Sequence, residues 1–367
     1  MKDSNALDCL LAVLRSPERA AEFVRQPAMW QEIKRLAEVH RFTGHLAYST
    51  SAWLPPSEKE WRDQILMTHH RRHARRLAAL RRLVEVFAEE RIPCVSLKGP
   101  LLAERFYEQP FLRPSNDLDL VVREGNIGRA ARLVLRLGYS LDGSYSWDIH
   151  RVASHHLELH APGSPEIELH YAMQVGRTRL EPAAFIERSV TWKSAAGFEA
   201  QVLSNADEAF HSCLHAASHA FRRLRWIYDF LRITGRLTPE ERRTVCGMVR
   251  EQGQTGPFAA ARLALQEFFL ASPALDCGDI PLPWLWRPLT AAHIRAMVDR
   301  VEGGGNLLMT STFYERLAGR VDMGRLAGSP LKAAQVAAYF VRRMLRTRMY
   351  RFTHTPRPGA LLASLPE

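Results

Sequence analysis

The sequence predicts an α+β protein in which a small mixed sheet with helices is flanked by N-terminal and C-terminal helical regions. Two patterns support this fold class. Apolar residues recur at helical spacing near both ends of the chain, whereas short runs of β-forming residues bounded by glycine and proline lie between residues 92 and 203. The composition agrees, because 46% of the 367 residues are hydrophobic and 24% are charged, which is ordinary for a globular protein and excludes global disorder.

Three consecutive domains are expected. The N-terminal helical region, 1–91, has apolar residues three and four positions apart and ends in a long helix from about residue 58 to 90. The α/β core covers 92–203. The C-terminal helical domain covers 204–367 and starts with a single long helix, for which Ser204 fits the cap; the helix is expected over Asp207–Ile233.

The core is expected to contain four strands and two helices. Their chain order is strand 92–99, helix 100–108, strand 116–122, helix 126–137, strand 156–160 and strand 166–170. Pro100 fits the first turn of the first helix, and Gly138 fits the C-cap of the second. The connection over 161–165 contains two prolines and a glycine, so the last two strands are expected to form a hairpin.

The charge balance favours anionic partners. Fifty Lys and Arg residues against thirty-nine Asp and Glu residues give a formal net charge of +11. Nucleotides, polyphosphates, nucleic acids and acidic membrane surfaces all fit such a charge. Two runs are strongly basic, His69–Arg82 and Arg342–Arg357, and the second also contains aromatic residues, a combination that suits RNA or DNA. Solvated helix faces and a basic tail are the simpler explanation of these runs.

The five cysteines share no regular spacing; they are Cys9, Cys94, Cys213, Cys246 and Cys277. Because no two of them form a CxxC pair, neither a zinc knuckle nor a disulfide framework is expected. We therefore expect reduced thiols in a cytoplasmic protein. Asp3 and Asp8 interrupt the first residues, which argues against a secretory signal, and no apolar stretch approaches the roughly 20 residues that span a bilayer.

The candidate chemistry is concentrated in Asp117 and Asp119. Side chains at positions i and i+2 of a strand point to the same face, and two carboxylates so placed repel each other unless a cation lies between them. Ligation by oxygen alone suits Mg²⁺, with Mn²⁺ as the alternative. A third carboxylate on a neighbouring strand would complete a two-metal site, for which Glu168 is favoured and Glu166 is the fallback. Such sites perform phosphoryl or nucleotidyl transfer.

A phosphate-binding turn is expected upstream of this pair. Lys98 and Gly99 stand where a strand passes into a helix, and glycine there lets a phosphate approach the backbone at the helix N-terminus. Lys98 adds a positive charge, and Arg113 is expected to clamp phosphate from the following loop.

Histidines mark two further places. A polar stripe on the predicted helix contains His211, His215, His219, Arg222, Trp226 and Asp229. We interpret it as lining the nucleotide or acceptor cleft rather than as a solvated face, and a separate zinc site is disfavoured because no fourth ligand is evident. His155 and His156 are expected to be solvated at an edge strand, with substrate contact as the alternative. His170 shares the face of Glu168 and could orient that carboxylate.

The order of these features resembles the DNA polymerase β-like nucleotidyltransferase superfamily, whose hallmark is a glycine turn, a helix and a strand with two acidic residues. It resembles more closely an uncharacterised bacterial nucleotidyltransferase family with LKG, Y, R, D-[IL]-D-L, L-G-Y and acidic-x-His motifs before a histidine-rich helix. The corresponding residues are Leu97-Lys98-Gly99, Tyr107, Arg113, Asp117-Leu-Asp119-Leu120, Leu137-Gly138-Tyr139 and Glu168-Leu-His170. The resemblance implies a polymerase-β-like core in which Asp117, Asp119 and Glu168 bind two Mg²⁺ ions and Lys98-Gly99 lies at the triphosphate.

The function expected from these features is transfer of a nucleoside monophosphate from a nucleoside triphosphate, with ATP favoured, to a hydroxyl, amine or phosphate, releasing pyrophosphate. A small molecule, peptide or protein is the favoured acceptor. One alternative keeps the fold but acts on RNA or DNA ends, which the basic runs would hold. Another is a degenerate protein that only binds nucleotide or a partner, because Pro100 replaces the small residue that the superfamily has after its first glycine.

Overall fold

The computed structural model describes residues 6–141, 147, 150, 154–175, 178–180, 182–219, 221–271, 275, 277, 294, 295, 298 and 359–366. The chain divides into two units, each built from separate stretches. The first, called the helical unit, comprises Met1–Leu77, Lys98–Ser115 and Ser204–Gly319; the second, called the sheet unit, comprises Ala78–Leu97, Asn116–Leu203 and Arg320–Glu367. The three consecutive domains expected from the sequence stay a prediction.

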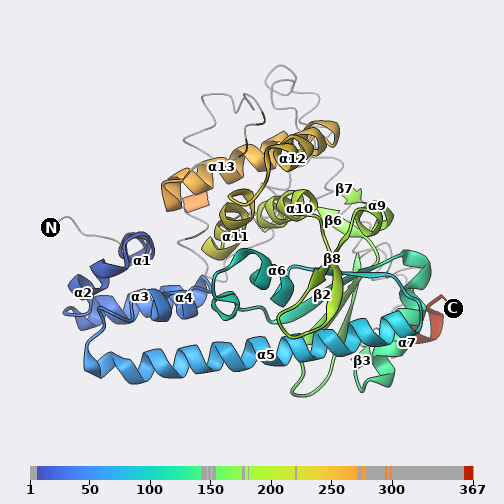
Figure 1. Cartoon of the computed structure of the whole chain (residues 1–367), viewed down its shortest axis with the longest axis horizontal. Helices are drawn as coiled ribbons and strands as arrows, with labels where there is room; N and C mark the ends of the chain where they lie inside the picture. Colours follow the sequence, from blue (N-terminus) through green and yellow to red (C-terminus); the bar gives the residue numbers. More distant parts are fainter. Residues whose placement is uncertain are drawn as a thin grey trace, which may run out of the picture. The chain divides into compact units, whose positions relative to one another are not determined.

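In the described part of the sheet unit, seven strands form one mixed sheet in the order β3-β4-β5-β2-β1-β9-β8. Three of them, β2, β3 and β8, are labelled in Figure 1. Their bounds are Ser140–Leu141 (β3), His156–His160 (β4), Glu166–His170 (β5), Asp117–Val122 (β2), Cys94–Leu97 (β1), Glu199–Val202 (β9) and Val190–Lys193 (β8). The β2–β5 and β1–β9 pairs are parallel and the other pairs are antiparallel. This mixed sheet, in a chain that is helical before and after it, confirms the predicted α+β fold class.

One face of the sheet is apolar where β4, β5 and β2 lie side by side. The side chains of Leu157, Ile167 and Leu120 on this face are fully buried. Helix α7 (Ile127–Arg136) contacts β4 and β5 and buries its own apolar side. Because side chains alternate along a strand, the residues between these positions point to the opposite face.

The opposite face changes character from one strand to the next. On β4 and β5 it carries histidines and glutamates, and on β2 it carries Asp117 and Asp119. Beyond them it becomes apolar, where Val95, Leu97 and Val121 pack with Phe185 of α9 (Pro182–Glu187). The apolar part anchors the sheet, and the polar part holds a row of carboxylates and imidazoles, of which Asp119 and His170 are buried.

The helical unit is built from amphipathic helices. They are α1 (Ala6–Arg15), α2 (Ala20–Phe23), α3 (Pro27–Val39), α4 (Thr43–Ser49), α6 (Gly99–Phe106), α10 (Asn205–Ser218), α11 (Leu224–Thr234), α12 (Pro239–Glu251) and α13 (Thr255–Phe269). Short 3-10 helices cover Pro17–Arg19, Pro56–Glu58 and Pro110–Leu112. Ser204 caps α10 by accepting a hydrogen bond from the Asp207 backbone, as predicted, and Thr238 and Glu241 form a capping box on α12.

Three more helices complete the described chain. Helix α5 (Lys59–Glu89) contributes residues to both units and carries the basic run His69–Arg82. In the sheet unit, a 3-10 helix over Glu124–Asn126 precedes α7, and α18 covers Ala360–Ser364. The second basic run, Arg342–Arg357, lies outside the described residues. So do residues 281–288 and 303–305, where prolines and glycines predict breaks between helices. No described helix has both the length and the apolar character needed to cross a membrane.

The single helix predicted over Asp207–Ile233 is wrong. Helix α10 ends at Ser218 and α11 begins at Leu224. Between them, Phe221 has a left-handed backbone with φ of 53°, and its N–H bonds the C=O of Ala216 across the helix end. The ring of Phe221 is buried, so packing of this side chain overrides the continuous helical spacing of the sequence.

The sequence did not predict β3, β6, β7, β8, β9 or α9. These elements are short, and β6 (Met173–Val175) pairs only with β7 (Thr178–Leu180) in the described residues. Strand β9 is the important omission, because Ser96 of β1 pairs with Val202 and β9 thereby extends the main sheet. The available signal was the alternation of apolar and polar residues from Phe198 to Val202.

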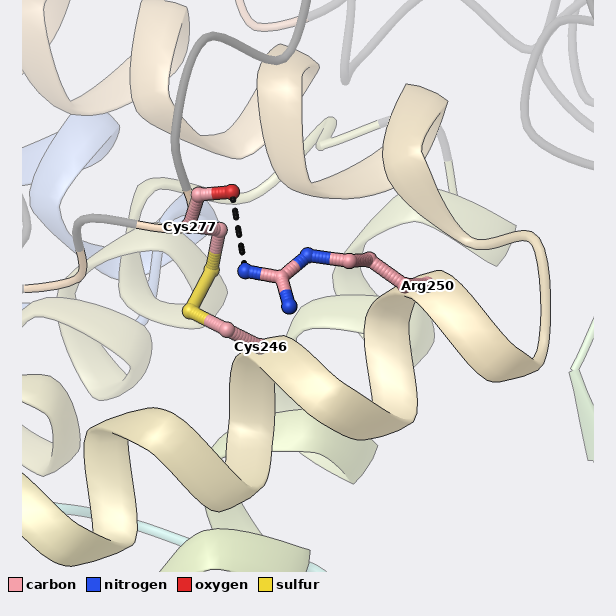
Figure 2. The surroundings of a disulfide bond; sticks show 3 residues. All are labelled: Cys246, Arg250 and Cys277. Atoms are coloured by element: carbon pink, nitrogen blue, oxygen red, sulfur yellow. Dashed lines mark hydrogen bonds between the residues drawn. A yellow bond between two sulfur atoms is a disulfide. The ribbon is translucent and has the colours of Figure 1, made fainter.

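The cysteines differ from the expectation. Cys246 of α12 is bonded to Cys277, with 4.9 Å between their Cα atoms, and Arg250 donates to the Cys277 carbonyl oxygen at 3.5 Å (Figure 2). The prediction that all thiols are reduced is therefore wrong for this pair, whereas Cys9, Cys94 and Cys213 are free. The two bonded residues are 31 positions apart, so their spacing gave no indication of contact.

Candidate active site

The acidic residues meet because β2 and β5 run parallel in a fixed register. Asp117 is the register partner of Glu166, and Asp119 is the partner of Glu168. Register partners present their side chains on the same face of a sheet, so four carboxylates share this face. One-residue slippage of either strand is opposed by the buried leucines and isoleucine of the other face.

The closest contacts within the face converge on His170. Its Nε2 lies 3.0 Å from Oδ1 of Asp119 and 3.2 Å from Oε2 of Glu168. Asp119 and His170 are buried, whereas 24% of the Glu168 side chain is exposed. One ligand atom from each of these three residues lies within 4.8 Å of the others, a spacing that a metal ion could bridge.

The electrostatics of the face show an excess of negative charge. Burial alone would lower the pKa of His170, but its hydrogen bonds and charge interactions with Asp119 and Glu168 outweigh burial and raise it. Burial raises the pKa of Glu166, and the charges of Glu158, Glu168 and Asp117 raise it further against the opposing effect of His160. A cation bound among these carboxylates would relieve that repulsion.

The residues present fit a divalent cation. Two carboxylates and one imidazole offer oxygen and nitrogen donors, a set that Mg²⁺ can use through its oxygens and Mn²⁺ through both. Glu168, the favoured third carboxylate, belongs to this group of three, and the fallback Glu166 does not. Asp117, predicted as a ligand, is half-buried and lies beside Glu166 outside the group.

Lys98 and Gly99 follow β1, whose last residue, Leu97, is the register partner of Asp119. Both have left-handed backbones, with φ of 46° at Lys98 and 57° at Gly99. The open space around Gly99 would accommodate a side chain, so its backbone conformation is what favours glycine. At Lys98 the same conformation is strained, a cost often found at functional turns. Gly99 is the first residue of α6, as the phosphate-binding turn requires.

Arg113 is engaged inside the helical unit. Its Nε and Nη2 donate to the two carboxylate oxygens of Asp229 at 2.8 and 3.0 Å, and Nη1 donates to the Gly99 carbonyl at 3.0 Å. Tyr107 donates to the same Asp229 at 2.6 Å, and all of these side chains are buried. These contacts use three of the five guanidinium donors, which favours a role in holding Gly99 over a direct clamp on phosphate.

The predicted histidine stripe spans two helices rather than one. His219 stacks on Trp226 with ring centroids 4.7 Å apart, and His215 meets the same ring edge-on at 5.3 Å. Burial and then the charge of Lys98 lower the pKa of both histidines, that of His219 to about 4, so both are neutral at pH 7. The structure therefore gathers Lys98, His215, His219 and Trp226 in the helical unit. Asp229 leaves the stripe and pairs with Arg113.

The sequence reading missed the structural partners of two predicted residues. It treated Tyr107 as a motif residue without a role and Asp229 as part of a solvated or cleft-lining stripe. The available signal was the pair of donors itself. A buried arginine and a buried tyrosine each need a hydrogen-bond acceptor, so a carboxylate from elsewhere in the chain was to be expected. The buried pair of Arg105 and Glu208, 3.1 Å apart, was missed for the same reason.

Comparison with known proteins identifies the family of the chain. Residues 26–269 match a family described as uncharacterised nucleotidyltransferase, which covers both the sheet and the helices around the Lys98 turn. No curated protein matches the chain. With a matching region that exceeds half of its length, the chain belongs to this nucleotidyltransferase family.

Proposed function

We propose that the protein transfers a nucleoside monophosphate from a nucleoside triphosphate, ATP in the first instance, to a hydroxyl, amine or phosphate of a small-molecule, peptide or protein acceptor. The observation that carries the proposal is the parallel register of β2 and β5, which pairs Asp119 with Glu168 beside His170. Family membership supports the reaction type, and this pairing is the proposed place for the cation that such transfer requires.

In the proposed reaction, the carboxylates bind the cation, and one of them accepts the proton of the acceptor group. Asp119 and Glu168 would bind it, with Asp117 at the end of the same strand as a further ligand. A bound Mg²⁺ or Mn²⁺ supplies positive charge that makes the acceptor oxygen easier to deprotonate and offsets charge on the triphosphate. Glu168, the more exposed of the pair, accepts the acceptor's proton. The acceptor oxygen bonds to the α-phosphorus, the bond to the β-phosphate oxygen breaks, and pyrophosphate leaves.

The turn after β1 is the proposed binding place for the phosphates of the nucleotide. Lys98 would neutralise charge on the triphosphate, and the N-terminus of α6 would add a favourable dipole. Arg113 acts through the backbone, because its bond to the Gly99 carbonyl fixes the turn while Asp229 fixes Arg113. Pro100 removes one backbone donor from this turn, so the lysine side chain carries more of the interaction.

The aromatic cluster near Lys98 is the proposed contact for the base or the acceptor. His215 and His219 are neutral and can accept or donate a hydrogen bond without repelling Lys98. Trp226 is half-buried, and one of its neighbours, His219, stacks on the ring at 4.7 Å. A base would therefore approach the edge of the cluster or displace His219.

Labelled triphosphates test the proposal. The protein is incubated with each of the four triphosphates, Mg²⁺ or Mn²⁺ and cell extract, and mass spectrometry identifies what becomes labelled while pyrophosphate is measured. Asp117→Asn combined with Asp119→Asn is expected to lower pyrophosphate release at least about 1,000-fold with little change in melting temperature. Glu199→Gln is the matched control, since this exposed glutamate on β9 is expected to leave turnover unchanged. Undiminished turnover in the double variant contradicts the proposal.

A nucleic-acid acceptor is the second candidate, favoured by exposed arginines on α5. Arg71, Arg72 and Arg75 lie on the surface of that helix within the basic run. If they hold RNA or DNA, binding should weaken steeply with salt, because each phosphate contact releases counterions. Affinity for RNA that is independent of ionic strength rules out this acceptor.

A further inference from the structure

We propose that His155, His156 and His170 form a zinc site at the open end of the β4–β5 hairpin, where β4 begins and β5 ends. Its metal preference differs from that of the neighbouring carboxylate group. One nitrogen from each of the three imidazoles lies within 4.8 Å of the others. The ring centroids are 4.5 Å apart for His155 and His156, 5.6 Å for His155 and His170, and 5.1 Å for His156 and His170. Zinc-bound nitrogens lie about 3.4 Å apart, so small side-chain rotations would complete the site.

The backbone holds the three histidines in place. His156 and His170 are register partners on adjacent antiparallel strands, so their side chains share one face. His155 lies just before β4, and its carbonyl accepts hydrogen bonds from the backbones of Tyr171 and Ala172 at 3.1 and 3.2 Å. These bonds at the strand end bring His155 to the side of His156, although consecutive residues of a regular strand would point apart.

The two ring nitrogens of His156 have different surroundings, which suits this residue to bind a metal. Its Nε2 lies 3.0 Å from Oε1 of Glu158, while its Nδ1 is buried and has no hydrogen-bond partner among the described residues. A carboxylate that takes one ring N–H leaves the other nitrogen with a lone pair, the arrangement that orients metal-bound histidines in proteins. A buried nitrogen without a partner is unfavourable, and a bound cation removes that penalty. His150 Nε2 and Ser154 Oγ also bond the His156 carbonyl, at 2.8 and 3.1 Å, which fixes the residue further.

The donor type selects the metal. Neutral imidazoles favour Zn²⁺ and similar ions, whereas carboxylates favour Mg²⁺ and Mn²⁺. The negative charges of Glu158, Asp119 and Glu168 near the histidines favour any cation there. Three protein ligands leave one position of a tetrahedral zinc open for water or another ligand. Since His170 belongs to both groups, zinc on the histidines would also fix the imidazole that contacts the two carboxylates.

Metal titration of the full-length, tag-free protein tests the site. After chelator treatment, calorimetry with Zn²⁺ in excess Mg²⁺ is expected to give one tight site per chain. Co²⁺ is expected to give the strong visible absorption of tetrahedral coordination without a thiolate band, which distinguishes the histidines from the free cysteines. A weak octahedral spectrum, a thiolate band, or displacement of zinc by Mg²⁺ overturns the proposal without any variant.

Variants then assign the ligands. His155→Gln and His156→Gln are each expected to weaken zinc affinity at least about 100-fold, and Glu158→Gln about 10-fold to 100-fold. His160→Gln on the same strand is the matched control and should bind as the wild type does. Asp117→Asn should retain zinc while losing transfer, so the zinc site and the proposed transferase reaction can fail separately. Wild-type affinity in the His155→Gln, His156→Gln double variant, or equal loss in His160→Gln, contradicts the assignment.

Discussion

Each of the two units contains a buried cluster of charged side chains, and the two clusters differ in their balance of charge. In the helical unit, Asp229 receives both sides of the Arg113 guanidinium and the Tyr107 hydroxyl, so one negative charge meets one positive charge. In the sheet unit, Asp119 and Glu168 face a single imidazole, His170. The first cluster is balanced and fully buried, whereas the second has surplus negative charge and a partly exposed member.

This difference in charge balance is what makes the second cluster the candidate functional site. A buried pair whose hydrogen bonds are all satisfied holds its elements in place and offers little to a ligand. A cluster with unmatched charge lowers the stability of the fold, because its like charges repel each other. A bound cation would remove that repulsion. Charge balance within the cluster, rather than burial or residue type, is therefore what distinguishes the two.

The largest effect is expected from the same substitution made in both clusters. Asp229→Asn replaces an acceptor oxygen with a donor facing Arg113 and leaves the guanidinium buried without a counter-charge, so unfolding free energy should fall by about 3–5 kcal/mol. Asp119→Asn keeps an oxygen for His170 and removes repulsion with Glu168, so the change should stay within about 1 kcal/mol. Urea unfolding measures both.

Equal losses from the two substitutions would show that the clusters are alike. A large loss from Asp119→Asn alone would assign the acidic face a structural role. Either result would remove the contrast on which the site assignment depends.

A second, intermediate effect concerns acid sensitivity in the helical unit. Burial and then the charges of Arg223 and Arg35 lower the pKa of His40 to about 4, and its ring is fully buried. Unfolding frees this histidine to bind a proton near pH 6.5, so stability is full above that pH and falls as pH drops towards 4. The loss is on the order of 3 kcal/mol. His40→Gln should make the decline in unfolding free energy between pH 7 and 4 less steep, while the other buried histidines, such as His219, keep part of it; an unchanged slope contradicts the prediction.

The smallest effect is opposite in sign and lies in the sheet unit. Because the pKa of His170 is raised, its contribution to stability is present below pH 6.5 and is lost as pH rises through the folded-state pKa. Burial opposes the carboxylates, which keeps the effect small. His170→Gln should remove this fall in unfolding free energy on the alkaline side. Divalent cation should reduce it in the wild type, and identical pH profiles for both proteins would argue against the charge coupling.

The sequence predicted the elements whose signals are local. The alternation around Asp117 and Asp119, the glycine after Lys98 and the turn between β4 and β5 gave those strands and the face they share. It also favoured Glu168 over Glu166 because Glu168 is central in its strand, and the metal-binding role of Glu168 stays a prediction. Period-two spacing is sufficient to bring such residues together once the strands pair.

What the sequence missed depended on contacts between distant residues. Arg113 was expected at phosphate, but its partner Asp229 is 116 positions away, and nothing in the spacing links them. Phe221 looks helical by position, yet its buried ring sits at a helix break. The disulfide of Cys246 with Cys277 likewise results from tertiary proximity. Local propensity does not encode these pairings, which tertiary packing decides.

The two faces of the sheet differ, since one packs against α7 and the other carries the polar side chains, and this difference bears on how the protein can change in evolution. The leucines and isoleucine beneath α7 pack one side of the sheet, so exposed or half-buried side chains on the other side, such as Glu158 and Glu168, can be exchanged without disturbing that packing. Under the two proposals made above, substitutions at positions such as 158 and 168 would alter metal preference or acceptor choice in small steps. A scaffold arranged in this way can diversify its chemistry while its architecture stays constant.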